Sequence, residues 1–257
     1  MKNKTLLKID INKVLGVKLD SIIIDSNYNF DYDKKIFSEK KAKLYGMFNY
    51  TNEINFDLDE FKNEEVGLVL KVNTANDSIM DRSLTDNRLK NLLQKYSDKK
   101  CSITLVHGHL SEAQMESLYT HSKINAIVST THGEGFGLPL LEAAANELPV
   151  VATDWSGHTD FLYVDGKRMF GKIDYELKPI AKEHVWKGVL EENTSWAYPI
   201  MSSYKEKMRE VYKDYGRFKS QAKKLAPWVK EKYSQDSLKS KFELAVLGDN
   251  NGSHVIL

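Results

Sequence analysis

The sequence predicts an α/β fold in which helices cover both faces of a parallel β-sheet, followed by amphipathic helices at the C-terminus. Three observations lead to this prediction. Short apolar runs alternate with helix-compatible stretches between residues 43 and 153, as in sheets whose strands are buried on both faces. A glycine-rich segment joins one of these runs to an alanine-rich helix at residues 133–146. Beyond about residue 198 the chain is rich in lysine, with apolar residues at helical spacing.

The apolar runs and the stretches between them define the expected elements in order. Residues 20–25 (DSIIID) are consistent with a short strand, in a segment that otherwise shows little pattern. The further expected strands are residues 44–48, 66–72, 102–107, 124–129 and 149–153. The expected helices between them are residues 55–63, 85–96, 111–121 and 139–146. Ser111 and Gln114 have the spacing of a capping box at the start of the third helix.

The C-terminal part of the chain predicts helices packed on the sheet. Amphipathic helices are expected at residues 204–215, 218–233 and 238–247, and Pro227 is expected to start a new helical turn. Lysine stems in such helices cover apolar surface while their charges stay in water. A local nucleic-acid-binding face is the alternative interpretation, although Glu and Asp are mixed with the lysines.

Composition narrows the class of protein. The chain of 257 residues has 37 Lys and Arg against 36 Asp and Glu, so its net charge of +1 provides no overall field that favours nucleic acid. Cys101 is the single cysteine, which excludes an internal disulfide, and its apolar surroundings favour a small buried residue over a nucleophile. No segment approaches 18 consecutive apolar residues. We therefore expect a soluble cytoplasmic protein without a membrane span.

The segment with the clearest chemistry is HGEGFGLP, which follows an expected strand. Three glycines in five positions let the backbone bend tightly and approach a ligand without an intervening Cβ. Pro139 suits the first turn of the helix that follows. The free N–H groups at the start of that helix, together with the glycine turn, favour a diphosphate.

Two carboxylates belong to the same segment. Glu134 lies between the glycines, and Glu142 lies eight positions later on the expected helix. Carboxylates at an anion site are best explained as acceptors for paired hydroxyl groups, such as those of a ribose or hexose. The pattern therefore favours a phosphorylated sugar over a bare phosphate.

The string EGFGLPLLE, followed by AAANELPVVATDWSG, resembles the E-x7-E motif region of retaining glycosyltransferases of the GT-B fold, and of family 4 (glycosyl transferases group 1) in particular. The resemblance extends more loosely over residues 43–233 and implies the C-terminal, donor-binding domain of that fold. It divides the chain into residues 1–42, an extension or remnant of the acceptor domain, and a Rossmann-like nucleotide-sugar-binding domain at 43–200. The remaining two parts of this division are a packed helical segment at 201–247 and a tail at 248–257.

The resemblance also implies roles for individual residues. Glu134 would be the catalytic group that positions the donor sugar, and Glu142 would hold the nucleotide ribose. The loop around them would contact the sugar and phosphate of a UDP- or GDP-linked donor, without a metal or a cofactor. The loop residues expected to bind the donor are His132, Gly133, Gly135, Phe136, Gly137 and Leu138. Trp155, in the loop after the next strand, would stack on a base or sugar or serve as a buried anchor.

The chain departs from the family pattern in its phosphate-binding bases. The family carries an Arg and a Lys after the first strand of this domain, whereas residues 46–53 contain neither. Lys71, at the end of a strand, and Arg82, expected in the following loop, are candidates to replace them, with salt-bridging or solvated roles as the alternatives. His107, after the third strand, is expected near the nucleotide base, and a zinc site there is not supported by the spacing of Cys and His.

The length of the chain is the second departure. A complete GT-B enzyme needs two Rossmann-like domains, usually about 350 residues or more. We therefore expect a homodimer neighbour or a separate chain to supply the acceptor side, the acceptor being a glycan, lipid, protein or modified DNA. The first alternative is a nucleotide-sugar-binding module that is inactive alone. A sugar-nucleotide epimerase of related fold is a further alternative.

Overall fold

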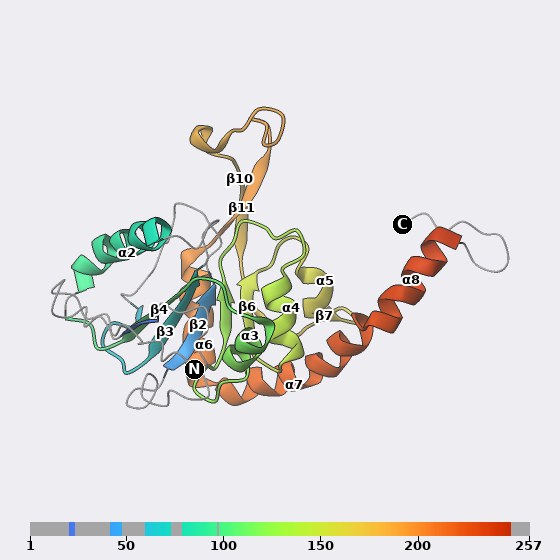
Figure 1. Cartoon of the computed structure of the whole chain (residues 1–257), viewed down its shortest axis with the longest axis horizontal. Coiled ribbons are helices and arrows are strands. Elements are labelled where there is room, and N and C mark those ends of the chain that lie inside the picture. The colour runs from blue at the N-terminus through green and yellow to red at the C-terminus, as the bar shows by residue number, and fades with distance from the viewer. Residues whose placement is uncertain (1–20, 24–41, 48–59, 73–78, 97, 248–257) are drawn as a thin grey trace, which may run out of the picture.

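The computed structural model describes residues 21–23, 42–47, 60–72, 79–96 and 98–247. Its central sheet has seven strands in the order β1-β4-β3-β2-β5-β6-β9 (Figure 1), and every neighbouring pair is parallel. The strands are β1 (Ser21–Ile23), β2 (Ala42–Met47), β3 (Gly67–Val72), β4 (Ser102–His107), β5 (Ile127–Ser129), β6 (Val150–Thr153) and β9 (Gly171–Ile173). This arrangement confirms the predicted parallel α/β fold.

The strand order identifies where a ligand site belongs. Leaving out the edge strand β1, the order β4-β3-β2-β5-β6-β9 is the third, second, first, fourth, fifth and sixth strand along the chain. This is the doubly wound Rossmann order, in which the chain changes direction across the sheet between β2 and β5. Ligands of such sheets bind at the carboxyl ends of the strands beside this switch point.

Helices cover both faces of the sheet. The helices are α2 (Ile79–Leu93), α3 (Glu112–Tyr119), α4 (Leu138–Ala145), α5 (Thr159–Leu162), α6 (Met201–Lys213), α7 (Tyr215–Lys232) and α8 (Gln235–Leu247), with short 3-10 helices η2 (Gln94–Tyr96) and η3 (Lys182–His184). Adjacent strand residues face opposite cores. Val106 packs with residues of α3, α4, α5 and α7, whereas Leu105 packs with residues of α2 and α6. The continuous apolar runs of the sequence reflect this double burial.

The observed elements confirm most of the expected ones. Ser111 caps α3 with the predicted capping box, because its side chain accepts the Gln114 amide and its own amide donates to Gln114 Oε1 at 2.8 Å. The α-helix expected at 55–63 is wrong in its described part, since residue 60 is in a 3-10 helix and residues 61–65 form turns and bends. Residues 55–59 lie outside the described residues. α2 begins at Ile79, earlier than predicted, and Cys101 is buried as expected.

Pro227 was expected to start a helical turn and instead lies inside α7. A proline there removes one backbone hydrogen bond and crowds the preceding turn. α7 nevertheless continues, because Leu225, Ala226 and Val229 around the proline are buried at 2% exposure or less against the sheet and its helices. Tertiary burial of the apolar face offsets the local cost.

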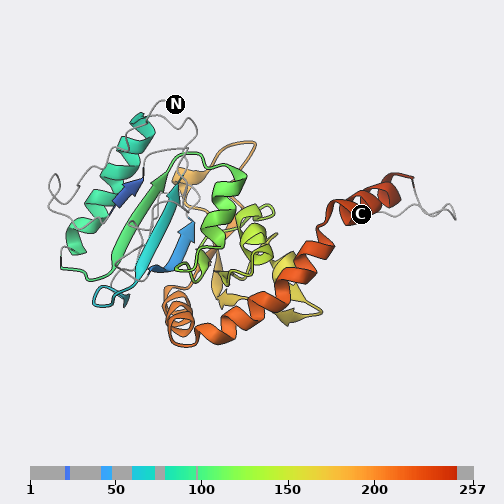
Figure 2. The ribbon, with the colours of Figure 1, turned by 60° about the horizontal axis from the view of Figure 1, so that its bottom comes forward.

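α6 and α7 bury residues against the sheet and its helices, among them Val211 and Leu225, whereas α8 does not. α8 extends away from the sheet and its covering helices (Figures 1 and 2). Leu238, Phe242 and Val246 occupy the same side of this helix and remain 47%, 68% and 60% exposed. Their helical spacing led to the prediction of packing, but the described residues provide no surface that covers them.

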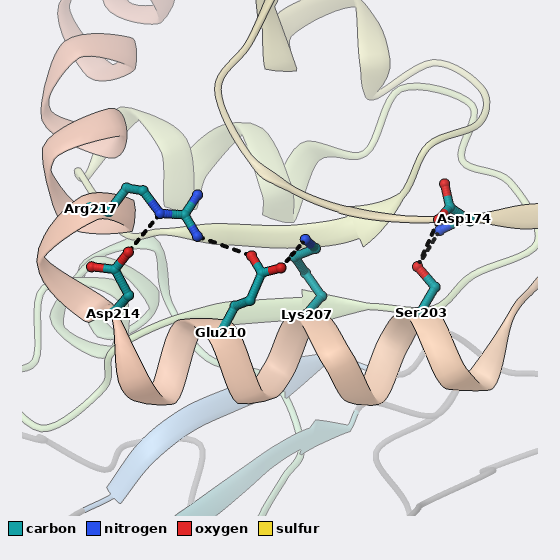
Figure 3. A network of polar contacts seen from close by, with 6 residues as sticks. All are labelled: Asp174, Ser203, Lys207, Glu210, Asp214 and Arg217. Carbon is teal, nitrogen blue, oxygen red and sulfur yellow. Dashed lines mark hydrogen bonds and ion pairs between the residues drawn. The ribbon is translucent and has the colours of Figure 1, made fainter.

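Two groups of polar contacts lie along α6 (Figure 3). Arg217 bonds Asp214 at 2.8 Å and Glu210 at 3.0 Å, and Lys207 bonds the same Glu210 at 2.9 Å. At the other end of the helix, the Ser203 hydroxyl accepts the amide of Asp174, at the end of β9, at 2.9 Å. The Ser203 contact holds the start of α6 against the connection from β9 to β10, whereas the contacts of Arg217 join the end of α6 to the start of α7.

Residues 163–199, for which the sequence predicted no elements, form two hairpins. β7 (Tyr163–Val164) and β8 (Lys167–Arg168) are joined by Asp165 and Gly166, both with positive φ, as a tight turn requires. β10 (Tyr175–Pro179) pairs antiparallel with β11 (Ser195–Pro199). This second hairpin, with its tip at residues 180–194, projects from the body of the molecule (Figure 1). We refer to residues 175–199 as the β10–β11 arm.

Candidate functional site

The glycine-rich segment follows β5, beside the switch point of the sheet. Residues 133–137, the glycine loop, lead directly into α4, whose N-cap is Gly137 and whose first turn contains Leu138 and Pro139. No side chain of the described residues caps this end of the helix. Pro139 has no N–H, and the amides of Leu140 and Leu141 donate to the Gly137 carbonyl at 2.9 and 3.0 Å. The amide of Leu138 is therefore the one that this turn leaves for solvent or for an anion, which the helix dipole also favours.

A second loop, residues 154–158 after β6, lies directly against the glycine loop; we call it the tryptophan loop. A Cβ placed on Gly157 would lie 2.1 Å from the carbonyl oxygen of Gly135. A Cβ on Gly137, where φ is +84°, would lie 2.9 Å from the Cβ of His158. Gly157 requires glycine because it meets the backbone of the glycine loop, and Gly137 requires it because of its left-handed φ and the close His158 side chain.

Ser156 of the tryptophan loop holds Glu134 by its backbone. The Ser156 hydroxyl accepts the Glu134 amide at 2.7 Å and donates to the Glu134 carbonyl, which also accepts the Gly157 amide at 3.1 Å. Ser156 adopts a left-handed φ of +82° to do so. Such a backbone costs a non-glycine residue about 1–3 kcal/mol and is retained where surrounding contacts offset it. Sequence reasoning missed this residue, because its partner lies 22 positions away.

The two motif carboxylates have different surroundings. Glu134 is half-buried between the loops, whereas Glu142 lies on the exposed side of α4. The hydroxyl of Tyr119, on α3, donates to Glu142 Oε2 at 3.0 Å. Burial, and then the Glu142 charge, raise the pKa of Tyr119 far above its ordinary value. Tyr119 therefore stays a neutral donor that orients the Glu142 carboxylate.

His158 is fully buried beneath the glycine loop. Its Nε2 donates to the Thr153 carbonyl at 2.6 Å, and the described residues offer no partner to its Nδ1. Burial lowers the pKa of His158, opposed by its bond to Thr153 and by the charges of Glu134 and Asp154. The imidazole is thus neutral and fills the space that the absent Cβ of Gly137 leaves.

The ring of His132, predicted to contact a donor phosphate, lies against the β10–β11 arm. Its Nδ1 donates to the Ala197 carbonyl at 2.9 Å, since a carbonyl can only accept. The ring stacks on Trp196, with centroids 5.1 Å apart and planes at 12°, and contacts Tyr198 at 4.5 Å. The arm therefore occupies one ring nitrogen and the faces of the His132 ring. The contact of His132 with a donor phosphate remains a prediction.

Phe136 and Leu138 flank the start of α4 in opposite environments. The ring of Phe136 contacts Phe161 and Tyr233, each with centroids 5.5 Å away. Its side chain is thus part of the core, and the backbone is the part left for a ligand. Leu138, in contrast, is 58% exposed.

The candidate phosphate-binding bases are not equally close to the strand ends. Lys71, in β3, is 8% exposed, and its Nζ donates to the carbonyl of Gly108. It therefore lies beside His107, the buried last residue of β4. Arg82, expected in a loop, is instead in the first turn of α2, because that helix begins before the predicted start. Residues 48–53 of the stretch that lacks Arg and Lys lie outside the described residues.

Two absences concern only the part of the chain that the structure describes. It contains no group of three or more His, Cys, Asp or Glu arranged to hold a metal ion. None of its helices is both long and apolar enough to cross a membrane. Trp155 of the tryptophan loop is 37% exposed, and its ring contacts that of Tyr175 at 5.3 Å.

The segment that carries both loops also carries the match to a known family. Residues 79–170 match glycosyl transferases group 1. This group 1 segment contains the helices α2 to α5 and the strands β4 to β8. A comparison with curated proteins gives no match.

Solved glycosyltransferase structures share the fold. HepE of Anabaena, in complex with UDP and glucose, is 10% identical, with 79% of this chain and 47% of that chain covered and a TM-score of 0.52. Sucrose-phosphate synthase of Thermosynechococcus elongatus is 12% identical, with 84% and 47% covered and a TM-score of 0.51. TarM is 18% identical, with 79% and 34% covered and a TM-score of 0.49. The chain thus spans less than half of each, and at these identities the likeness concerns the fold, which is the Rossmann-like fold of GT-B glycosyltransferases.

Proposed function

We propose that this chain is the donor-binding half of a retaining, family 4-like glycosyltransferase that takes its sugar from a UDP- or GDP-linked donor. The observation that carries the proposal is the glycine loop beside the switch point, running into the uncapped start of α4. Free N–H groups and the helix dipole make such a helix end favourable for a diphosphate. The group 1 match over residues 79–170 supports the same assignment.

The proposed roles follow the motif. Glu134 would position the donor sugar, and the backbone of Gly133, Gly135, Phe136, Gly137 and Leu138 would contact sugar and phosphate. Glu142 would accept the ribose hydroxyls, in the orientation that the Tyr119 hydroxyl supports. The acceptor would attack on the face from which the nucleotide leaves. Backbone N–H groups held in such positions stabilise the negative charge that develops on the leaving diphosphate during the reaction.

The leaving diphosphate needs compensation for the missing Arg and Lys. Lys71 is the favoured candidate, because it lies at the end of β3 beside His107 and Gly108. His107 would then contact the base, and His132 and Arg82 are retained as weaker candidates for phosphate contacts. The start of α4 supplies the rest of the stabilisation, so the proposed transfer uses no metal and no cofactor. Activity is accordingly expected to survive EDTA unchanged.

Calorimetric titration with UDP, UDP-glucose, GDP and GDP-mannose tests the donor site. UDP comes first because HepE, which shares the fold, is in complex with UDP and glucose. Glu142→Gln should weaken binding about 10- to 100-fold, since hydrogen bonds to a charged group contribute about 1.5–3 kcal/mol. Glu116→Gln, on the exposed surface of α3, is the matched control and should bind as the unchanged chain does. Absence of binding at millimolar nucleotide, or equal binding by Glu142→Gln, would refute the proposal.

A second candidate function is a nucleotide-sugar-binding module that is inactive alone and works with a partner chain or a dimer neighbour. It is favoured by the absence of Arg and Lys from residues 46–53, where the family pattern carries both. The acceptor, whether glycan, lipid, protein or modified DNA, would then lie against the partner. Hydrolysis or transfer of a bound donor sugar by the purified chain, followed by release of UDP, would argue against this candidate and for the first.

A further inference from the structure

The β10–β11 arm contacts the tryptophan loop and the residue that directly precedes the glycine loop. On the β11 side, Trp196 and Tyr198 hold the ring of His132, which directly precedes the glycine loop. On the β10 side, Tyr175 lies against Trp155 of the tryptophan loop. The two strands of one hairpin thus hold one loop and the residue before the other, and the two loops approach each other at the start of α4.

The glycine loop needs such restraint from outside. Three glycines in five residues give the free loop a large conformational entropy. This entropy is lost when the loop is fixed in one conformation. α4 fixes the loop at its end, and Ser156 holds it in the middle by both backbone groups of Glu134. His132 directly precedes the loop, and its side chain contacts the arm.

The contact to His132 has three parts that act together. Ala197 is fully buried, and its carbonyl fixes one ring nitrogen at 2.9 Å. Trp196 provides a nearly parallel face at 12°, and Tyr198 approaches at 58° from a second direction. Trp196 also contacts His184, at the tip of the arm, with centroids 5.2 Å apart. The contacts therefore continue from the tip of the arm to the start of the glycine loop.

We infer that Trp196 is a positioning residue that, through His132, restrains the glycine loop, so that the placement of the arm sets the placement of the donor-binding backbone. The arm tip carries exposed side chains, Trp186 at 67% and Val189 at 61%. The restraint itself is independent of ligand identity, whereas its effect on donor affinity rests on the proposed function.

Hydrogen exchange of the loop amides tests the restraint without a ligand. In Trp196→Ala, the amides of residues 133–137 should exchange about two- to tenfold faster, the range expected from the loss of one aromatic pair. The amides of β3 serve as an internal reference and should keep their rates. Trp186→Ala removes an exposed tryptophan from the same arm and should leave the loop unchanged, and Trp196→Phe should restore most of the protection. Equal loop rates in Trp196→Ala and the unchanged chain would overturn the inference, as would equal acceleration in Trp186→Ala.

Two additional measurements keep the test decisive. If Trp196→Ala does not fold, His132→Asn takes its place, because an amide retains a donor for the Ala197 carbonyl and removes the ring stack. UDP titration then separates the two proposals. Binding that weakens by the same two- to tenfold factor in Trp196→Ala, but not in Trp186→Ala, supports both. If the unchanged chain binds neither UDP nor GDP, the proposed function fails while the exchange result still decides the restraint.

Discussion

The two site loops and the projecting elements, which are the arm tip and α8, contrast in how their positions are fixed. The glycine loop has little intrinsic preference for one shape, yet α4 fixes its end, the tryptophan loop holds its middle, and the arm holds His132 directly before it. α8 has the regular hydrogen bonds of a helix but leaves Phe242 68% exposed. Regular local structure and a fixed tertiary position are therefore separate properties, and burial decides the second.

The largest effect is expected where the two loops meet. Gly157→Ala places a Cβ 2.1 Å from the Gly135 carbonyl oxygen, so one loop must move. We expect the free energy of unfolding to fall by at least about 3 kcal/mol, measured by urea unfolding. Gly216→Ala, at an open position near the start of α7, is the control and should change stability by less than about 1 kcal/mol. Near-equal losses in the two variants would show that the loops do not pack as described.

A pair of apolar truncations in adjacent helices sharpens the same contrast. Leu225→Ala in α7 removes a side chain that is 1% exposed and should cost about 3 kcal/mol in thermal or urea unfolding. Phe242→Ala in α8 removes a larger side chain that is 68% exposed and should cost less than about 0.5 kcal/mol. A cost at Phe242 comparable to that at Leu225 would mean that α8 is covered, for instance by a second copy of the chain.

The smallest effect concerns pH and the buried imidazole under the glycine loop. Burial lowers the pKa of His158 in the folded chain, so the unfolded chain takes up this proton at a higher pH. The corresponding stability is complete above the unfolded pKa of 6.5 and decreases as the pH falls through the folded pKa. His158→Gln keeps a donor for the Thr153 carbonyl and does not titrate. Urea unfolding from pH 7.5 to 5 should therefore show a flatter decline in this variant, and an unchanged slope would assign the decline to other groups.

The sequence by itself determined the elements and the kind of site. Apolar runs buried on both faces of a sheet are visible as continuous runs, and a capping box at Ser111 is a local pattern. The glycine loop and the start of α4 were recognisable because backbone freedom and helix initiation depend on residues close together in the sequence. The positions of Glu134 and Glu142 followed from the same short string.

Only the tertiary structure decided how that site is held. Ser156 and Glu134 are 22 positions apart, and His132 and Ala197 are 65 apart, so no local pattern links either pair. The strand order that sets β5 beside β2, the arm, and the exposure of α8 likewise depend on which surfaces meet in the folded chain. Helical periodicity predicted packing for α8, which was wrong because the described residues offer no surface that covers its apolar side. Pro227 was predicted to start a helical turn, which was wrong because burial of its neighbours in α7 outweighs the local preference of proline.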